Sequence, residues 1–139
     1  MADAHFKKFK SILRQNNYFV TKARMSLFGH LQNSSALSTV DLLNKVEKHH
    51  KTSVYRNIAV FEELGIITKV RLGWTTKIEL SDIFKHHHHH FTCLGCGSIF
   101  DLPEVPEIES NITQLTRQID AKATDHSLEI RGYCKKCNI

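Results

Sequence analysis

The feature that most constrains the fold of this chain is a pair of Cys-x-x-Cys motifs, one past the middle of the sequence and one near its end. Two cysteines separated by two residues can hold one metal ion in a tight turn, because backbone amides there point toward the thiolates. The two motifs together predict one tetrahedral zinc site, which has no open coordination position and is therefore structural. The alternative to a zinc site is that the four cysteines are buried residues with no relation to one another. The predicted ligands are Cys93, Cys96, Cys134 and Cys137.

Nothing in the sequence suggests secretion or a membrane anchor. The N-terminal segment MADAHFKKFK lacks the apolar core of a secretory signal. No apolar run approaches the roughly 18 residues of a membrane-spanning helix. We therefore expect a cytoplasmic protein, in which thiols stay reduced and paired cysteines indicate metal ligands rather than disulfides.

The 37 residues between the two cysteine pairs form a longer loop than a simple zinc ribbon has. We predict strands at 86–94 and 98–102, a helix that begins near Pro106, and a last strand at 127–133. A unit of this size buries little apolar surface by itself. We expect zinc and a second copy of the chain to stabilise it, so residues 86–139 are predicted to be a metal-binding dimerisation domain.

The first 80 residues have the pattern of a small helical domain that ends in a β-hairpin. Apolar residues recur at helical spacing in four segments, and Thr21 and Ser38 can cap the second and third helices. Strands are expected at 66–72 and 77–80. Helices followed by a hairpin is the order of a winged-helix DNA-binding domain, which we predict for residues 1–80.

Charge is divided unevenly along the chain. Residues 1–85 carry 14 Lys and Arg against 7 Asp and Glu, whereas residues 86–139 carry 5 against 7. A basic first part suits a polyanion such as double-stranded DNA, although an excess of lysine also serves solubility. We therefore predict an α+β protein with an N-terminal DNA-binding domain, a hinge at 81–85 and a small C-terminal domain.

The predicted DNA contacts open the fourth helix, because the N-terminus of a recognition helix faces base edges and phosphates. Arg56 can bind guanine through two hydrogen bonds, and Tyr55 can contact a thymine methyl group or a phosphate. The alternative is that Tyr55 belongs to the core and Arg56 to a surface ion pair. The candidate DNA-binding residues are Ser53, Tyr55, Arg56 and Asn57.

Five consecutive histidines, His86–His90, precede the first cysteine pair. An expression tag or a solvated run is the alternative to a metal site. Successive side chains of a strand alternate between its two faces, so one strand can supply two metal sites. Neutral imidazole suits zinc, iron, nickel and copper. We expect His88 and His90, with Asp101 and Glu79, to form one site, and His87 and His89, with Glu109 and His126, to form another.

Taken together, Thr-Ser-Val-Tyr-Arg, the histidine run, Cys-x-x-Cys-Gly, His126-Ser-Leu and the closing Cys-x-x-Cys resemble the ferric uptake regulator superfamily over residues 18–137. The resemblance implies a winged-helix domain, a hinge and a dimerisation domain. It also implies a repressor that controls metal uptake genes by binding AT-rich palindromic operators as a metal-loaded homodimer, with a tetramer left open. The role of His86 stays unassigned.

By position, the resemblance implies three metal sites in this chain. The four cysteines match the family's structural zinc site. Glu79, His88, His90 and Asp101 match its regulatory site, which takes zinc or iron, with manganese as an alternative. The additional site in the dimerisation domain is matched by His87, His89, Glu109 and His126.

Three positions depart from the family pattern. Ala36 stands where a histidine ligand of the regulatory site is usual. His89 stands where iron regulators commonly have aspartate, which favours the zinc uptake branch. Phe19 replaces a lysine that usually reaches the DNA minor groove. The regulatory site is therefore expected to lack one ligand, and operator preference is expected to differ.

Two other functions remain as alternatives. A peroxide sensor of the same family, in which bound iron oxidises a ligand histidine, is favoured by Asp101. A metal storage protein or chaperone is a different class, and the basic N-terminal part argues against it. The sequence has no His-Glu-x-x-His motif and no deaminase motif, so we do not expect an enzyme.

Overall fold

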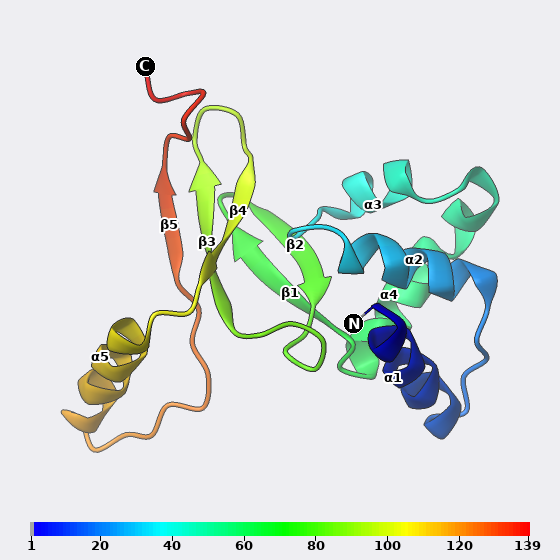
Figure 1. Ribbon diagram of the computed structural model, residues 1–139, viewed down its shortest axis with the longest axis horizontal. Helices are drawn as coiled ribbons and strands as arrows, with labels where there is room; N and C mark the ends of the chain where they lie inside the picture. Colours follow the sequence, from blue (N-terminus) through cyan, green and yellow to red (C-terminus); the bar gives the residue numbers. More distant parts are fainter. Residues whose placement is uncertain (1) are drawn as a thin grey trace. The chain divides into compact units, whose positions relative to one another are not determined.

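A computed structural model of the protein describes residues 2–139 (Figure 1). The chain forms two compact units, a first unit that ends at His86 and a second unit, His87–Ile139. The first unit is helical with a β-hairpin, and the second is a small sheet with one helix. This arrangement confirms the predicted α+β fold class.

Short helices build the first unit, and two of them begin at the predicted caps. The Thr21 side chain accepts a hydrogen bond from the backbone N–H of Arg24 at 3.2 Å. Ser38 and Asp41 exchange side-chain and backbone bonds in a capping box. The helical elements are α1 (Ala2–Gln15), α2 (Lys22–Gln32), α3 (Thr39–Lys45), the 3₁₀ helix η1 (Lys48–Ser53) and α4 (Val54–Glu63).

The connector between α3 and α4 is more ordered than the sequence suggests. By residue type, Thr52 or Ser53 could cap the next helix after a short connector. Instead, η1 occupies the connector, and Ser53 makes no side-chain cap bond to α4. Its hydroxyl donates to the backbone carbonyl of His50 at 2.9 Å, so this serine ties the connector to the start of α4.

The hydrophobic core of the protein lies in the first unit. The rings of Phe9 and Phe28 stack with centroids 4.2 Å apart, and Phe61 meets Phe9 edge-on at 5.2 Å. Aliphatic side chains from all four α-helices and from the hairpin complete this core. The core holds α4 with its N-terminal residues at the surface, as a DNA-reading helix requires.

A two-stranded hairpin follows α4 and forms the wing. Strands β1 (Ile67–Leu72) and β2 (Thr75–Leu80) pair antiparallel, with Leu72 opposite Thr75. The turn is therefore Gly73-Trp74, shorter than the predicted turn over 73–76. Gly73 adopts a φ of 61°, a left-handed conformation that a two-residue turn favours and glycine allows without strain.

Residues 81–85, for which the sequence predicts a hinge, are anchored to the first unit. The Ser81 hydroxyl donates to the carbonyl of Gly65 at 2.6 Å. Phe84 is buried, with its ring 5.0 Å from that of Phe28. Lys85 donates to the carbonyl of Ser34 at 3.2 Å. The change from one unit to the other therefore falls after this segment, at His86 and His87.

The second unit has the predicted β-β-α-β order. Its sheet has the strand order β4-β3-β5, in which β3 pairs antiparallel with β4 and parallel with β5. Helix α5 connects the two outer strands, β4 and β5 (Figure 1). The elements are β3 (His88–Cys93), β4 (Ile99–Pro103), α5 (Pro106–Arg117) and β5 (Glu129–Gly132).

This second unit has almost no hydrophobic core of its own. Among its residues, the only buried hydrophobic side chain is Cys93, and α5 has no buried residue. Phe100 and Ile130 flank Phe91 across the sheet, and each is 46% exposed. An apolar stripe therefore crosses the sheet face that also carries His89.

Within residues 2–139, no helix is both long enough and apolar enough to cross a membrane.

Candidate metal centres and nucleic-acid interface

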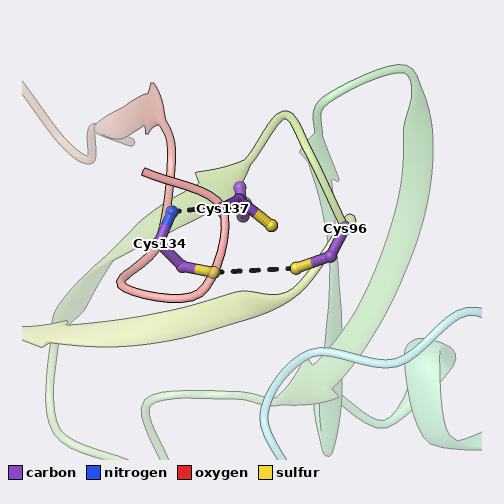
Figure 2. Close-up of side chains that lie close together, drawn as sticks. Cys96, Cys134 and Cys137 are labelled. Carbon is purple, nitrogen blue, oxygen red and sulfur yellow. Dashed lines mark hydrogen bonds between the residues drawn. The ribbon is translucent and has the colours of Figure 1, made fainter. Parts of the chain in front are cut away.

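Two turns bring the four cysteines together at one end of the second unit. Cys93 ends β3, Cys96 lies in the turn after it, and Cys134 and Cys137 follow β5. The four sulfur atoms lie within 4.8 Å of one another. Figure 2 shows the side chains of Cys96 and Cys134 pointing at each other. Their sulfur atoms are 3.8 Å apart. The backbone N–H of Cys134 donates to the Cys93 sulfur at 3.3 Å.

The sulfur positions fit zinc. Zinc lies about 2.3 Å from a thiolate, so two sulfurs of a tetrahedral site are about 3.8 Å apart. The Cys96–Cys134 separation has this value, whereas a disulfide needs roughly 2.05 Å. All four cysteines are free thiols. The donor set and its spacing therefore suit a closed four-thiolate zinc site.

The thiols of this cluster differ in acidity. Hydrogen bonds from the backbone N–H groups of Cys134 and Cys96 lower the pKa of Cys93 to about 6. Interaction with the sulfurs of Cys134 and Cys93 raises the pKa of Cys137 to about 12. Cys93 is therefore a thiolate at neutral pH without metal, whereas Cys137 keeps its proton.

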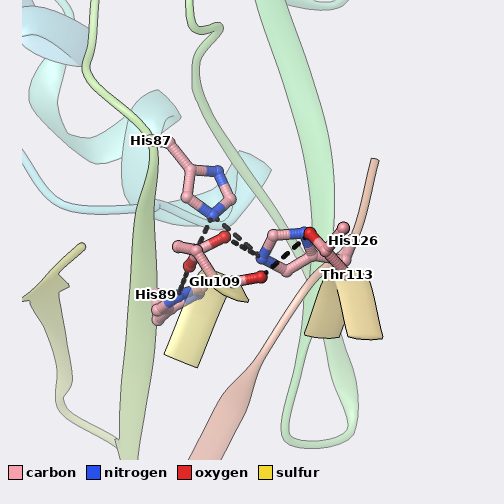
Figure 3. A network of polar contacts seen from close by, with 5 residues as sticks. All are labelled: His87, His89, Glu109, Thr113 and His126. Carbon is pink, nitrogen blue, oxygen red and sulfur yellow. Dashed lines mark hydrogen bonds and ion pairs between the residues drawn. The ribbon is translucent and has the colours of Figure 1, made fainter. Parts of the chain in front are cut away.

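A second cluster joins two histidines of the histidine run to Glu109 on α5 and to His126 (Figure 3). The Glu109 carboxylate lies 2.7 Å from His89 Nε2, 3.5 Å from His87 Nε2 and 2.9 Å from His126 Nε2. His87 Nε2 and His126 Nε2 are 3.1 Å apart. The structure therefore brings together the four residues that the sequence assigned to the additional site.

Glu109 is the common partner of these three histidines. Burial acts to raise the pKa of its carboxyl group, but the bond to His89 and the charges of His126 and His87 outweigh burial and hold it below its usual value. The backbone carbonyl of Glu109 also accepts a bond from Thr113 at 3.1 Å, which stabilises this turn of α5 (Figure 3). Three imidazoles around an ionised carboxylate suit a divalent transition-metal ion.

On the other face of β3, His88 and His90 form a third group with Asp101. Their rings lie 4.7 Å apart, and β-pairing sets His90 opposite Asp101. One Asp101 oxygen is 4.0 Å from the Nε2 atom of each histidine. An ion about 2.1 Å from each ligand fits between atoms up to roughly 4.2 Å apart. Glu79, the fourth predicted ligand, belongs to the first unit and lies on β2 opposite Thr68.

Ala36, which stands where the family usually has a ligand histidine, is buried in the first unit at 6% exposure. The next residue, Leu37, pairs antiparallel with Ile78 through backbone bonds of 2.8 and 2.7 Å. Continued by one residue, this register sets Ala36 opposite Glu79. A methyl side chain therefore occupies the position beside the predicted carboxylate ligand.

The residues predicted to contact DNA differ in how they are held at the start of α4. Tyr55 is 63% exposed and Arg56 is also exposed, so the alternative that places Tyr55 in the core is wrong. Asn57 is 4% exposed, and its side-chain oxygen accepts a hydrogen bond from Arg24 Nε at 3.1 Å. Phe19, at the usual lysine position, is 84% exposed, and its carbonyl accepts from Arg24 at 2.6 Å.

Arg24 and Gly95 were not predicted as site residues, yet both position residues that were. Arg24 links Asn57 on α4 to the backbone before α2. At Gly95, a Cβ atom would lie 2.8 Å from the Cβ atom of Cys137. Glycine between the first two cysteines was visible in the motif, but its reason was not, because the close approach involves a residue 42 positions later.

Comparison with known proteins supports the resemblance found in the sequence. The family model described as "Ferric uptake regulator family" matches residues 15–131. The ferric uptake regulation protein of Campylobacter jejuni is 31% identical over 144 aligned positions, covering 98% of this chain and 90% of that protein. The peroxide-responsive repressor PerR of Staphylococcus epidermidis is 30% identical over 132 positions, covering 90% of this chain and 85% of that protein.

The fold is also found in a solved structure. The Helicobacter pylori ferric uptake regulator, described as having three functional metal binding sites, matches with a TM-score of 0.82. The match covers 100% of this chain and 95% of that chain at 23% identity, which establishes the fold. The family model spans most of the sequence, and curated relatives are at least 30% identical over nearly its whole length. The chain therefore belongs to the ferric uptake regulator family, whose members are transcription regulators and not enzymes.

Proposed function

We propose that this protein is a cytoplasmic, metal-responsive repressor that binds double-stranded DNA as a homodimer and controls metal uptake genes. The observation that carries the proposal is the pairing of a winged-helix unit with a unit that holds the four-cysteine, His87/His89/Glu109/His126 and His88/His90/Asp101 clusters. A storage protein would need the metal ligands but not the exposed face of α4.

The four cysteines are proposed to hold a structural zinc ion. Zinc supplies four strong bonds to thiolates when bound, and those bonds contribute to folding. Cys93 and Cys96 present their sulfurs from the end of β3, and Cys134 and Cys137 present theirs from the segment after β5. The ligands therefore join β3 to β5 at one end of the sheet, in a unit that buries almost no apolar side chain.

His88, His90 and Asp101 are proposed to form the regulatory site together with Glu79. A divalent ion, zinc or iron, with manganese as an alternative, supplies a bridge between these ligand atoms when bound. Glu79 lies on the wing and the other three ligands on the second unit. Ligation by both units would favour one arrangement of the two DNA-binding units. A metal shifts such an equilibrium only through tighter binding to the favoured form.

His87, His89, Glu109 and His126 are proposed to form the additional site of the family. All four residues belong to the second unit, so their ligation cannot favour one arrangement of the two units over another. We propose that this site stabilises the dimerisation unit. Its support is the compact set of contacts around the Glu109 carboxylate.

The exposed apolar stripe of the second unit supports a homodimer. Phe91, Phe100 and Ile130 form a row across one sheet face. Leu115 on α5 and Ile119 just after this helix are 62% and 75% exposed. A second copy of the unit would remove this surface from water. A tetramer is compatible with the same surface but has no separate support.

Two copies of α4 would then read the two halves of an AT-rich palindrome. Tyr55 and Arg56 are placed at the exposed start of α4 and are proposed to contact bases and phosphates. The Ser53 hydroxyl and the side-chain amide of Asn57 each make a hydrogen bond within the first unit. We propose that both residues hold α4 in place, in addition to any contact that they make with a phosphate.

A peroxide-sensing repressor is the second candidate function. Asp101 favours it, as does the similarity to a protein named peroxide-responsive repressor. In that case bound iron and peroxide would oxidise a ligand histidine. A mass increase of about 16 on a histidine peptide after exposure to iron and peroxide, caused by one added oxygen, would identify this function.

The deciding experiment is a DNA titration that compares the dimer treated with a metal chelator and the dimer with zinc, iron or manganese added. The probe is an AT-rich palindromic promoter fragment. Metal is expected to raise the affinity, and the H88A/H90A double variant is expected to lose that response. His30 lies on α2, outside every described group of metal ligands, so H30N is a matched control. Equal affinity with and without metal would contradict the proposal, and failure to bind any such fragment would favour metal storage.

A further inference from the structure

A fourth group of metal-binding side chains lies in the first unit, far from the histidine run in the sequence. Glu47, His49 and His50 sit in the connector between α3 and α4, where η1 begins. One Glu47 carboxylate oxygen is 3.2 Å from His49 Nε2 and 3.7 Å from His50 Nε2. The two imidazole rings are 4.0 Å apart.

These separations match those between ligands of a single ion. Zinc lies about 2.0–2.1 Å from imidazole nitrogen and carboxylate oxygen, so two such ligands of a tetrahedral site are about 3.4 Å apart. The two measured nitrogen–oxygen distances fall on either side of this value. All three ligand atoms lie within 4.8 Å of one another, so modest side-chain rotation brings them around one ion.

We propose that Glu47, His49 and His50 bind a divalent transition-metal ion on the connector of the helix-turn-helix. Two imidazoles and one carboxylate suit zinc, nickel or copper, and three protein ligands leave at least one position open to water. The His50 side chain is 12% exposed and therefore largely held in place, whereas His49 and Glu47 are 69% and 67% exposed. The ligands are thus only partly ordered before an ion binds.

The charges around this site make it a weak one. Lys48 and Lys51 belong to η1, and Lys10 and Lys22 line the same surface pocket as the three ligands. Positive charge near a cation site lowers its affinity. The site is therefore filled only at metal concentrations above those that fill the four-thiolate site.

Occupancy would act on the element that precedes α4. The backbone carbonyl of His50 accepts a hydrogen bond from the Ser53 hydroxyl at 2.9 Å. Ser53 directly precedes the first residue of α4. An ion held by His49 and His50 would stiffen η1 at its middle. The proposed site thus places a second metal response at the DNA-binding element, independent of the sites in the second unit.

The test counts nickel ions bound to the full-length dimer at saturation by equilibrium dialysis. Wild-type protein and the H30N control are expected to bind one more ion per chain than H49A/H50A. The E47Q variant, changed only at an exposed side chain, is expected to bind that ion more weakly. Equal numbers and equal affinities in all four proteins would overturn the proposal and leave only a surface ion pair.

A second measurement uses wild-type protein alone, so a folding defect in the double variant cannot affect its result. In wild-type protein, zinc added beyond the first three ions is expected to shift the proton resonances of the His49 and His50 rings. The His30 ring resonances are expected to stay unchanged. Unshifted resonances of His49 and His50 would also overturn the proposal. Neither result depends on DNA binding, so the site can fail while the repressor function stands.

Discussion

The backbone of Gly95 packs directly against the side chain of Cys137. A Cβ atom at position 95 would lie 2.8 Å from the Cβ atom and 2.9 Å from the sulfur of Cys137. These distances are too short for non-bonded heavy atoms, so one of the two cysteine turns would have to move. The zinc site therefore depends on a residue that is not a ligand.

We expect G95A to weaken zinc binding and to lower the melting temperature of the zinc-loaded protein. The added methyl group separates the turns and lengthens the sulfur–sulfur distances that suit zinc. Zinc affinity is measured by competition with a chromophoric chelator. Leu94 is the neighbouring residue and is 55% exposed, so L94A is the matched control. Unchanged zinc affinity in G95A would contradict the close packing.

Zinc affinity is expected to fall as the pH falls. Zinc binds thiolates, so it must displace the proton of Cys137, whose pKa of about 12 keeps that thiol protonated at neutral pH. The pKa of Cys93 is lowered to about 6, so this group needs no deprotonation at neutral pH but does below that value. The affinity should therefore fall more steeply below about pH 6 than above it.

Chelator competition at several pH values tests this dependence. Calorimetry in buffers of different ionisation enthalpy gives the number of protons released. At neutral pH we expect fewer than four protons per zinc ion, because Cys93 is already ionised. Release of four protons would show that the thiols titrate as isolated groups, and an affinity that does not change with pH would contradict a protonated Cys137.

Replacing Arg56 with alanine is expected to weaken operator binding by about 1–3 kcal/mol and to relax specificity at one base pair. Arg56 is exposed at the start of α4, where a guanidinium can reach a guanine edge. Fluorescence anisotropy at fixed salt measures the affinity, and R117A, on α5 of the second unit, is the control. A loss that is equal for all sequences would instead assign Arg56 to a phosphate.

Arg24 and Asn57 are expected to be coupled. The Arg24 guanidinium donates to the buried Asn57 side chain and to the Phe19 carbonyl. Removing Arg24 takes this donor from the Asn57 oxygen, and removing Asn57 leaves Arg24 with the Phe19 carbonyl alone of these two acceptors. A double-mutant cycle of R24A, N57A and the double variant, measured by chemical unfolding, should give a coupling energy of about 0.5–3 kcal/mol. Additive effects would mean that the bond does not hold α4 in place.

Local sequence signals predicted most of the fold and the members of the three clusters. Thr21 and Ser38 cap the helices they were expected to cap, because capping depends only on neighbouring residues. The histidines separate onto the two faces of β3 because alternation is a property of any strand. Glu109 and His126 were predicted to complete the His87/His89 face, although no local pattern joins them to that strand, and the family resemblance assigned them to the same site.

Contacts distant in sequence were not predictable in the same way. The sequence motif gave Asn57 as a DNA contact, but its burial depends on Arg24, which is 33 positions earlier. Residues 81–85 were predicted to be a hinge because they lie between the helix-and-hairpin pattern of the first 80 residues and the strand pattern that begins at residue 86. Nothing local indicated that Phe84 enters the core. The η1 turn was missed because 3₁₀ turns have weak sequence preferences, and with it the grouping of Glu47, His49 and His50.

The A36H substitution is expected to raise the metal affinity of the regulatory site. The bridge between Leu37 and Ile78 sets residue 36 opposite Glu79, and Cβ atoms of opposite residues on paired strands are about 4.5–5.5 Å apart. An imidazole at this position can therefore approach the ion that the Glu79 carboxylate is proposed to bind. The added ligand should lower the metal concentration that gives half-maximal operator binding.

The matched control for A36H is A36L, which adds a side chain of similar bulk but no ligand atom. Ala36 is 6% exposed, so both variants must displace neighbours, and any loss of stability should be shared. Operator affinity is measured in metal-buffered solutions for wild-type, A36H and A36L proteins. If A36H needs as much metal as A36L, residue 36 does not reach the ion. Glu79 would then be the only ligand from the first unit in the proposed regulatory site.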